Sequence, residues 1–378
     1  MAELFVVPQG KFYLSRYPKR KNELLRAWDA ADEYLCNHIA ESQLACDSSR
    51  LLILNDSFGA LSVALNRTAP TMMTDSFLAQ KGALENYAAN DLDSNTLNVL
   101  PSTDELTGIY DIVLIKIPKS HALLEDQLRK LRPHITQNTT LIAAGMVKHL
   151  HASLGKLFEK VIGPTHASLA KKKARLIFSK YEEGLTVGDN PFPKRYQLEG
   201  TSYQITNHSG VFSRDSLDIG TRFFLQNLPS IESEGRIVDL GCGNGVVGLM
   251  MSINSPNSEL IFTDESFMAI ASAKENFKSV HGKELRAQFM VTNCLQGVGQ
   301  GSVDLILNNP PFHQQNVVSD SIAKQMFLES KHVLKERGEL WVIGNRHLGY
   351  HVALKELFGN CTVVAKNDKF VILTSIKR

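Results

Sequence analysis

The side chains best suited to chemistry lie in the run Asn308-Asn309-Pro310-Pro311-Phe312, which follows an apolar segment at residues 303–307. An amino group on a planar ring is a poor nucleophile because its lone pair is delocalised. The side-chain oxygen of Asn309 and the carbonyl of Pro310 can accept its two N–H bonds and aim the lone pair at an electrophile. The prolines fix the backbone, and Phe312 offers a stacking face. The run predicts chemistry on an amino nitrogen, with a plain proline turn as the alternative.

A glycine-rich turn earlier in the chain predicts a cofactor site. Ile237 and Val238 form an apolar run that predicts a central strand, and Asp239 stands at its carboxyl end, where ligands of open α/β sheets bind. The G-x-G-x-G spacing departs from the dinucleotide pattern, because Val246 stands where that pattern needs a third glycine. It matches the first motif of class I methyltransferases and therefore predicts S-adenosylmethionine, with a purely structural turn as the alternative. The predicted cofactor residues here are Asp239, Gly241, Cys242, Gly243 and Gly245.

Two further positions fit the same cofactor. Asp264 follows a predicted strand at residues 260–263 and can accept both ribose hydroxyls, or else cap the next helix, a role that Ser266 can also fill. Asn293 follows a predicted strand at 288–292 and can contact adenine, or be a turn residue. Cys242 and Cys294 raise a rival chemistry, methylation of a pyrimidine carbon through a cysteine adduct. The chain contains no Pro-Cys dipeptide, which disfavours that rival.

The composition is that of an ordinary globular protein. With 378 residues, 43% hydrophobic and 21% charged, the chain is expected to form two domains. It has no run of eighteen apolar residues and no basic, apolar leader, so we expect no membrane span and a cytoplasmic protein. Its five cysteines form no C-x-x-C pair, so we expect reduced thiols and no metal.

The chain reads as two α/β halves with mostly parallel sheets, joined by a linker at residues 181–198. Residues 51–59, 73–76, 85–86 and 110–118 parallel segments of the second half in the same order, which predicts two copies of one fold. In this alignment, Ser57 and Leu61 occupy the positions of Gly241 and Gly245, and Lys116 occupies the position of Asn309. Residues 1–180 therefore form a degenerate copy, and residues 199–378 the catalytic domain.

The sequence resembles the RsmC/RlmG group of ribosomal RNA guanine-N2 methyltransferases along essentially its whole length. Besides the two motifs with His313 and Gln314, the resemblance rests on residues 27–35 (AWDAADEYL), 52–61 (LILNDSFGAL), 210–221 (GVFSRDSLDIGT) and 344–348 (GNRHL). The N-terminal matches favour the RlmG branch, which modifies large-subunit 23S rRNA. The resemblance implies two tandem Rossmann-like domains with seven-stranded sheets, S-adenosylmethionine as cofactor, and Phe212 and Thr221 over its methionine end. For the stretch around Phe212 and Thr221, an N-terminal helix cap is the alternative.

The resemblance also gives the basic residues a use. Residues 1–180 hold 22 Lys and Arg against 18 Asp and Glu, whereas residues 181–378 hold 19 against 21. Clusters of Lys and Arg on a protein surface can bind RNA phosphates, although a solvated charged face is the commoner explanation. The expected RNA contacts are Lys171, Lys172, Lys173, Arg175, Arg346 and His347.

Three alternatives stay open at this point. Asn-Pro-Pro followed by an aromatic residue also serves methylation of a protein glutamine. The RNA could belong to the small subunit (16S), or the chain could be an RNA-binding assembly factor without catalysis. The sequence does not fix the target nucleotide, and a monomer is the default expectation for its oligomeric state.

Overall fold

The computed structural model describes the chain except residues 1, 21–22, 45–46, 231–233, 283–285 and 312–316, and leaves out the side chains of residues 317–320. The chain divides into two compact units, Met1–Phe192 (unit 1) and Pro193–Arg378 (unit 2). Residues 194–197, inside the expected linker, form a strand of unit 2.

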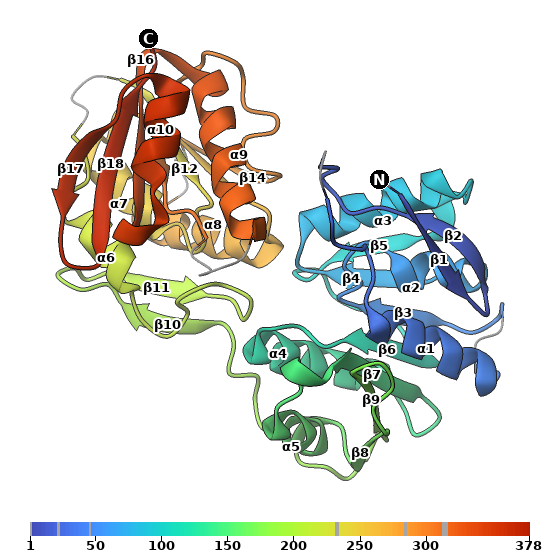
Figure 1. The fold of residues 1–378 in the computed structure, drawn as a ribbon. Helices are drawn as coiled ribbons and strands as arrows, with labels where there is room; N and C mark the ends of the chain where they lie inside the picture. The colour runs from blue at the N-terminus through green and yellow to red at the C-terminus, as the bar shows by residue number, and fades with distance from the viewer. Residues whose placement is uncertain (1, 21–22, 45–46, 231–233, 283–285, 312–316) are drawn as a thin grey trace. The chain divides into compact units, whose positions relative to one another are not determined.

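Unit 2 is a seven-stranded sheet with helices on both faces, preceded by a hairpin (Figure 1). The strand order is β14-β13-β12-β15-β16-β18-β17, and only β18 pairs antiparallel with its neighbours. The elements are β10 (Lys194–Gln197), β11 (Gln204–Asn207), α6 (Ile219–Leu225), β12 (Arg236–Leu240), α7 (Val246–Asn254), β13 (Glu259–Asp264), α8 (Phe267–His281), β14 (Ala287–Val291), β15 (Val303–Asn308), α9 (Val317–Val333), β16 (Leu334–Asn345), η5 (Arg346–Leu348), α10 (Tyr350–Phe358), β17 (Thr362–Lys366) and β18 (Phe370–Ile376).

Unit 1 repeats this topology, with strand order β5-β4-β3-β6-β7-β9-β8 and an antiparallel β9. Its elements are β1 (Glu3–Val7), β2 (Gly10–Leu14), α1 (Ala30–Glu41), β3 (Leu51–Leu54), α2 (Ala60–Ala64), η1 (Asn66–Thr68), β4 (Thr71–Thr74), α3 (Phe77–Ala89), η2 (Ser94–Thr96), β5 (Asn98–Pro101), β6 (Ile112–Lys116), α4 (His121–Leu131), η3 (Arg132–His134), β7 (Thr140–Met146), η4 (Val147–His149), α5 (Ala152–Val161), β8 (Thr165–Ala167) and β9 (Ala174–Ser179). The predicted class, two α/β copies with mostly parallel seven-stranded sheets, is confirmed.

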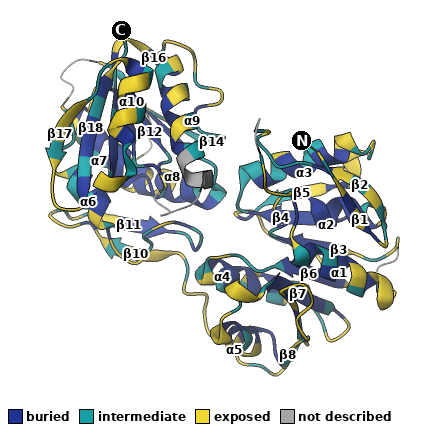
Figure 2. Cartoon of the chain, viewed as in Figure 1, coloured by how far each residue is buried: buried dark blue, intermediate teal, exposed yellow. Residues whose placement is uncertain are grey.

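The central strands of each sheet are buried on both faces, as Figure 2 shows by their dark colour between half-exposed helices. Neighbouring residues of one strand enter different cores: Ile237 packs with α6, α7 and α8, and Val238 packs with α9 and α10. Parallel strands covered on both sides need near-continuous apolar runs, which is the pattern in β3, β6, β12 and β15. That burial explains why the apolar runs located the central strands well.

The strand registers align the two units and correct one part of the sequence comparison. Leu54 pairs with Met73 and Ile115, as Leu240 pairs with Thr263 and Asn308. Asn55 of unit 1 therefore corresponds to Gly241 of unit 2, and Gly59 corresponds to Gly245. The predicted partners Ser57 and Leu61 were wrong by two residues, whereas the pairing of Lys116 with Asn309 is confirmed.

Candidate active site

The glycine turn after β12 is fastened to the end of the neighbouring strand β13. The backbone N–H groups of Gly241 and Cys242 donate to the Thr263 carbonyl at 2.8 and 3.0 Å. The N–H of Gly243 donates to Asp264 Oδ2 at 3.0 Å, and Asp264 Oδ1 accepts from the N–H of Ser266 at 3.0 Å. Ser266 is the N-cap of α8, so that role does not need Asp264. The carboxylate lies beside the turn, as a ribose contact requires.

Two glycines of the turn differ in what surrounds them. Gly243 has φ 54°, and a Cβ added there would meet nothing within 4 Å. Gly245 has φ 76°, and its added Cβ would lie 2.6 Å from Ala273 Cβ on α8. Gly245 thus permits helix packing, while Gly243 leaves open space beside the turn that a ligand can use.

Asp239 is buried, and its carboxylate faces the chain's own backbone. Asp239 Oδ2 accepts from the N–H of Gly248 in α7 at 2.8 Å. Burial, with a smaller contribution from Asp264, raises its pKa to about 8. Asp239 therefore shapes the turn through α7, an indirect contribution to a cofactor site.

The chemistry-bearing amide lies at the end of β15, next to β12 in the sheet. Asn309 Nδ2 donates to Thr221 Oγ1 in α6 at 3.1 Å. Asn309 Oδ1 is buried and has no hydrogen-bond partner among the described residues. Its neighbour Asn308 instead points inward and donates to the Leu240 carbonyl at 2.9 Å. Asn309 thus presents an unused acceptor, which is what an amino substrate needs. Pro310 is buried beside it, and Phe312 lies outside the described residues.

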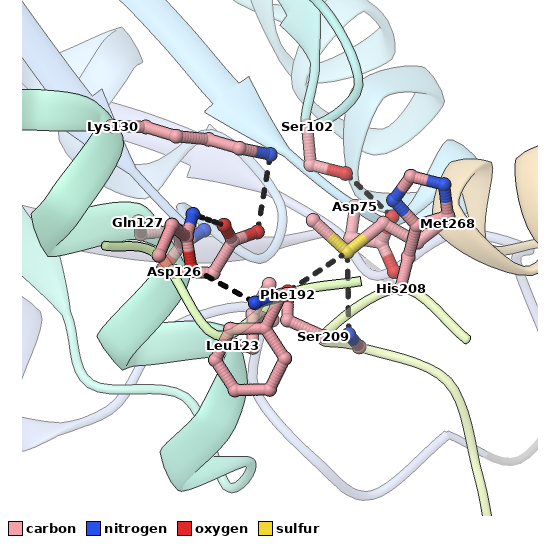
Figure 3. Close-up of polar contacts among 12 residues, drawn as sticks. Asp75, Ser102, Leu123, Asp126, Gln127, Lys130, Phe192, His208, Ser209 and Met268 are labelled. Carbon is pink, nitrogen blue, oxygen red and sulfur yellow. Dashed lines mark hydrogen bonds and ion pairs between the residues drawn. The ribbon is translucent and has the colours of Figure 1, made fainter. Parts of the chain in front are cut away.

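Two of the remaining predicted cofactor residues, Cys242 and Asn293, follow the ends of sheet strands, and Phe212 lies in a segment outside the sheet. Asn293 follows β14, and its Oδ1 accepts from Gln325 Nε2 at 3.3 Å. Burial raises the pKa of the Cys242 thiol well above its usual value, which disfavours a thiolate nucleophile. Phe212 is 67% exposed in the segment between β11 and α6. That segment is tied to α8 by Ser209, whose hydroxyl donates to Met268 Sδ at 3.3 Å (Figure 3).

The predicted RNA residues lie on two surfaces, each described within its own unit. Lys171, Lys172, Lys173 and Arg175 are exposed in unit 1, where Lys172 pairs with Glu33 at 2.7 Å. Arg346 and His347 in unit 2 line an open pocket of about 620 Å³ with Asn345, Asp368 and Lys369. The structure leaves these basic side chains accessible to a polyanion.

One asparagine in each unit, Asn276 or Asn86, holds the turn after the first central strand in place. In the sequence these two positions stood out only as a matching pair in the repeat. Asn276 bonds both backbone groups of Thr206 and the carbonyl of Asn244, at 2.7 to 2.9 Å. In unit 1, Asn86 likewise bonds the backbone of Ser15 and the carbonyl of Phe58, at 2.8 to 2.9 Å. The repeat includes the hairpin and its attachment to the turn.

Comparison with known proteins assigns the chain to a family. The model of the RLMG N-terminal domain matches residues 2–183, and that of the methyltransferase small domain matches residues 202–374. Ribosomal RNA large subunit methyltransferase G of Aeromonas hydrophila is 50% identical over 382 residues, and that of Streptomyces avermitilis 46% over 383 residues. Each alignment covers 100% of both chains. The chain belongs to the ribosomal RNA large subunit methyltransferase G family.

A solved structure extends the similarity to the fold. The T. thermophilus 16S rRNA N2 G1207 methyltransferase (RsmC), in complex with AdoMet and guanosine, covers 100% of this chain and 98% of its own. The TM-score is 0.77 at 18% identity, which shows a shared fold. Among the described residues of this family member, no helix is long and apolar enough to cross a membrane, and no group of His, Cys, Asp or Glu could hold a metal ion.

Proposed function

We propose that the chain transfers a methyl group from S-adenosylmethionine to the exocyclic N2 of a guanine in large-subunit (23S) ribosomal RNA. The observation that carries this proposal is the buried, unpartnered Oδ1 of Asn309, at the end of a strand that neighbours the glycine turn. A buried acceptor without a partner costs free energy, about 1–3 kcal/mol, and an arriving N–H bond would remove that cost. Relatives similar over their whole length are named as large subunit methyltransferases, which supports an rRNA substrate over a protein glutamine.

The cofactor fits the residues at this edge of the sheet. The open space at Gly243 admits a ligand against the backbone, and Asp264 stands where it can accept ribose hydroxyl bonds. Gly241, Cys242 and Gly245 build the turn, and Asp239 holds it through α7. We assign the adenine contact to Asn293 and the methionine end to Phe212 and Thr221. When bound, S-adenosylmethionine supplies an electrophilic methyl group.

The substrate amine is activated by position. Asn309 Oδ1 and the Pro310 carbonyl accept the two N–H bonds, which directs the nitrogen lone pair towards the methyl group. With the cofactor bound, the amine would take the methyl group as the bond from that carbon to sulfur breaks, and the extra proton would leave to water. Because Pro310 and Pro311 fix the backbone, the acceptors need little rearrangement, so alignment contributes most of the rate enhancement.

The RNA is held by charge, and the target base must leave its stack. We assign phosphate contacts to Lys171, Lys172, Lys173 and Arg175 in unit 1 and to Arg346 and His347 in unit 2. A guanine in a helix must be flipped out before its N2 can reach Asn309, at a cost of a few kcal/mol. This activity belongs in the cytoplasm, and we expect a monomer to suffice.

The direct test uses purified protein, S-adenosylmethionine and rRNA that lacks the modification. Nucleosides from separated 23S and 16S rRNA are then analysed by mass spectrometry. We expect N2-methylguanosine in 23S rRNA, and its loss with Asn309→Ala. Asn257→Ala, which truncates an exposed asparagine of the same unit, should methylate normally. Product in 16S rRNA alone, or undiminished product with Asn309→Ala, would contradict the proposal.

A further inference from the structure

A short chain of hydrogen bonds fixes which way the Asn309 amide faces. Asn309 Nδ2 donates to Thr221 Oγ1 at 3.1 Å, and Thr221 Oγ1 donates to Asp218 Oδ2 at 3.3 Å. The Thr221 backbone N–H also donates to Asp218 Oδ2, at 2.9 Å, because Asp218 is the N-cap of α6. Thr221 is buried, so its hydroxyl sits away from solvent.

The direction of each bond follows from what its members can do. An ionised carboxylate only accepts, so Asp218 obliges the Thr221 hydroxyl to donate towards it. The hydroxyl then offers only lone pairs to Asn309, and these select the amide's NH2 side. The Asn309 oxygen is left facing the other way, where it has no described partner. Rotated by half a turn, the amide would present N–H groups to the substrate amine and repel its N–H bonds.

We propose that Thr221 and Asp218 are positioning residues that keep the Asn309 carbonyl oxygen turned towards the substrate nitrogen. This inference rests on the proposed amino methylation and gives Thr221 a role besides lying near the cofactor. Neither residue touches the reacting atoms. Both act through the orientation of Asn309.

The same arrangement occurs in unit 1, where the first turn of α1 contacts the residue at the end of β6. Asp29 is the N-cap of α1, and Lys116 stands where unit 2 has Asn309. Lys116 Nζ lies 2.8 Å from Asp29 Oδ1 and 2.8 Å from Asp32 Oδ1, three residues into the helix turn as Thr221 is. In both units the strand-end side chain donates to the first turn of the helix. An ammonium group has nothing left with which to accept, whereas the amide of Asn309 keeps an oxygen.

Steady-state kinetics on the full chain test the role, with Thr221→Val removing the hydroxyl at nearly constant shape. We expect kcat for methyl transfer to fall at least tenfold, with KM for rRNA within about twofold, since alignment of the amine is lost and RNA binding is not. Thr221→Ser keeps the hydroxyl and should retain most of the activity. Unfolding midpoints of all variants identify any that merely fail to fold.

A double-mutant cycle separates this role from a direct one. If Thr221 acts through Asn309, adding Thr221→Val to Asn309→Ala causes no further loss of kcat. Multiplying losses in the double variant, or weaker S-adenosylmethionine binding with kcat intact, would overturn the inference. A wild-type chain that methylates no guanine N2 would refute the proposed function separately. The positioning role is then judged on whichever nitrogen is methylated, by the same ratio of Thr221→Val to Thr221→Ser.

Discussion

At the scale of single residues, Lys116 and Asn309 show how one change of side chain separates the two units. Lys116 is enclosed by Asp29 and Asp32, and although burial opposes its charge, these carboxylates raise its pKa overall. Burial raises the pKa of Asp32 to about 6. Buried charges such as those of Lys116 and Asp32 are stable only while they are paired, because removing one leaves the other uncompensated. The position that carries the proposed chemistry in unit 2 is thus occupied in unit 1 by an internal ion-pair network.

Removing the positive charge of Lys116 should lower the stability of unit 1 strongly. Lys116→Met leaves two carboxylates near each other without a counter-charge, and we expect a loss of about 3–5 kcal/mol in the free energy of unfolding. Urea denaturation would follow Trp28 fluorescence in a Trp341→Phe background, since the chain has only 2 tryptophans. Lys119→Met, at an exposed site, is the control and should unfold as the parent does. Equal stability of both variants would show that the network contributes nothing.

The raised pKa of Asp239 predicts a pH dependence of unit 2. With a pKa of about 8, the folded chain holds a proton that the unfolded chain, with an ordinary pKa near 4, has released. Stability therefore falls as pH rises from about 4 to about 8, by up to roughly 1.4 kcal/mol per pH unit. Asp239→Asn stays uncharged and can still accept from Gly248, so it should lose this dependence.

Urea denaturation between pH 5 and 9 on the basis of Trp341 fluorescence, in a Trp28→Phe background, measures the effect on unit 2. Asp368→Asn, an exposed acid of the same unit, should keep the parent's pH profile. The assignment fails if Asp239→Asn and the parent show the same slope across this range.

At the scale of elements, the sequence predicted what local pattern determines. The apolar runs that mark β12, β13 and β15 are continuous because both faces of those strands are buried, and the glycine spacing identified the turn. The alignment of the two turns was wrong by two residues, because loops drift in sequence while strand register fixes the true pairing. The bond from Asn309 to Thr221 spans 88 residues, so no local pattern announces it.

Within the turn, two glycine substitutions should have opposite consequences. Gly245→Ala places a Cβ 2.6 Å from Ala273 Cβ, so α7 and α8 must separate and unit 2 should lose most of its stability. Gly243→Ala meets open space and costs only about 1–2 kcal/mol for its left-handed backbone. Its methyl group would instead occupy the space offered to the cofactor. We expect S-adenosylmethionine affinity to fall at least tenfold by calorimetry, with the fold intact.

Gly359→Ala provides the matched control for Gly243→Ala. Gly359 also has a left-handed φ, 78°, and open space around its missing Cβ, but it ends α10. It should lose similar stability and bind S-adenosylmethionine normally. Normal binding by Gly243→Ala would place the cofactor elsewhere.

At the scale of the whole molecule, one fold is present twice and the copies differ in what they offer. The glycine at the helix start survives in both, as Gly59 and Gly245, because each permits close packing of two helices. Gly241 and Asp264, by contrast, correspond to Asn55 and Thr74 in unit 1. Asn55 donates to the Lys116 carbonyl and to Gln127, so unit 1 fills its own site with side chains. What packing requires is kept twice, whereas the groups suited to a ligand are found once.

A unit without its own chemistry can still contribute RNA affinity through its surface charge. Lys171→Glu combined with Lys173→Glu reverses two exposed charges and spares Lys172, which is paired with Glu33. We expect binding to 23S rRNA fragments to weaken at least tenfold near physiological salt. The slope of log K against log salt should become shallower by about 0.7–0.9 per lost phosphate contact. Affinity for S-adenosylmethionine should not change, because the proposed cofactor residues lie in unit 2.

The same charge change elsewhere in unit 1 distinguishes a docking surface from net charge. Lys156→Glu with Lys180→Glu also reverses two exposed lysines of that unit. If RNA binds at Lys171 and Lys173, this second pair should retain most of the affinity and most of the salt slope. If both pairs weaken binding equally, only the overall charge of unit 1 matters. If neither does, the phosphate contacts must come from other residues, and Arg346→Glu becomes the informative variant.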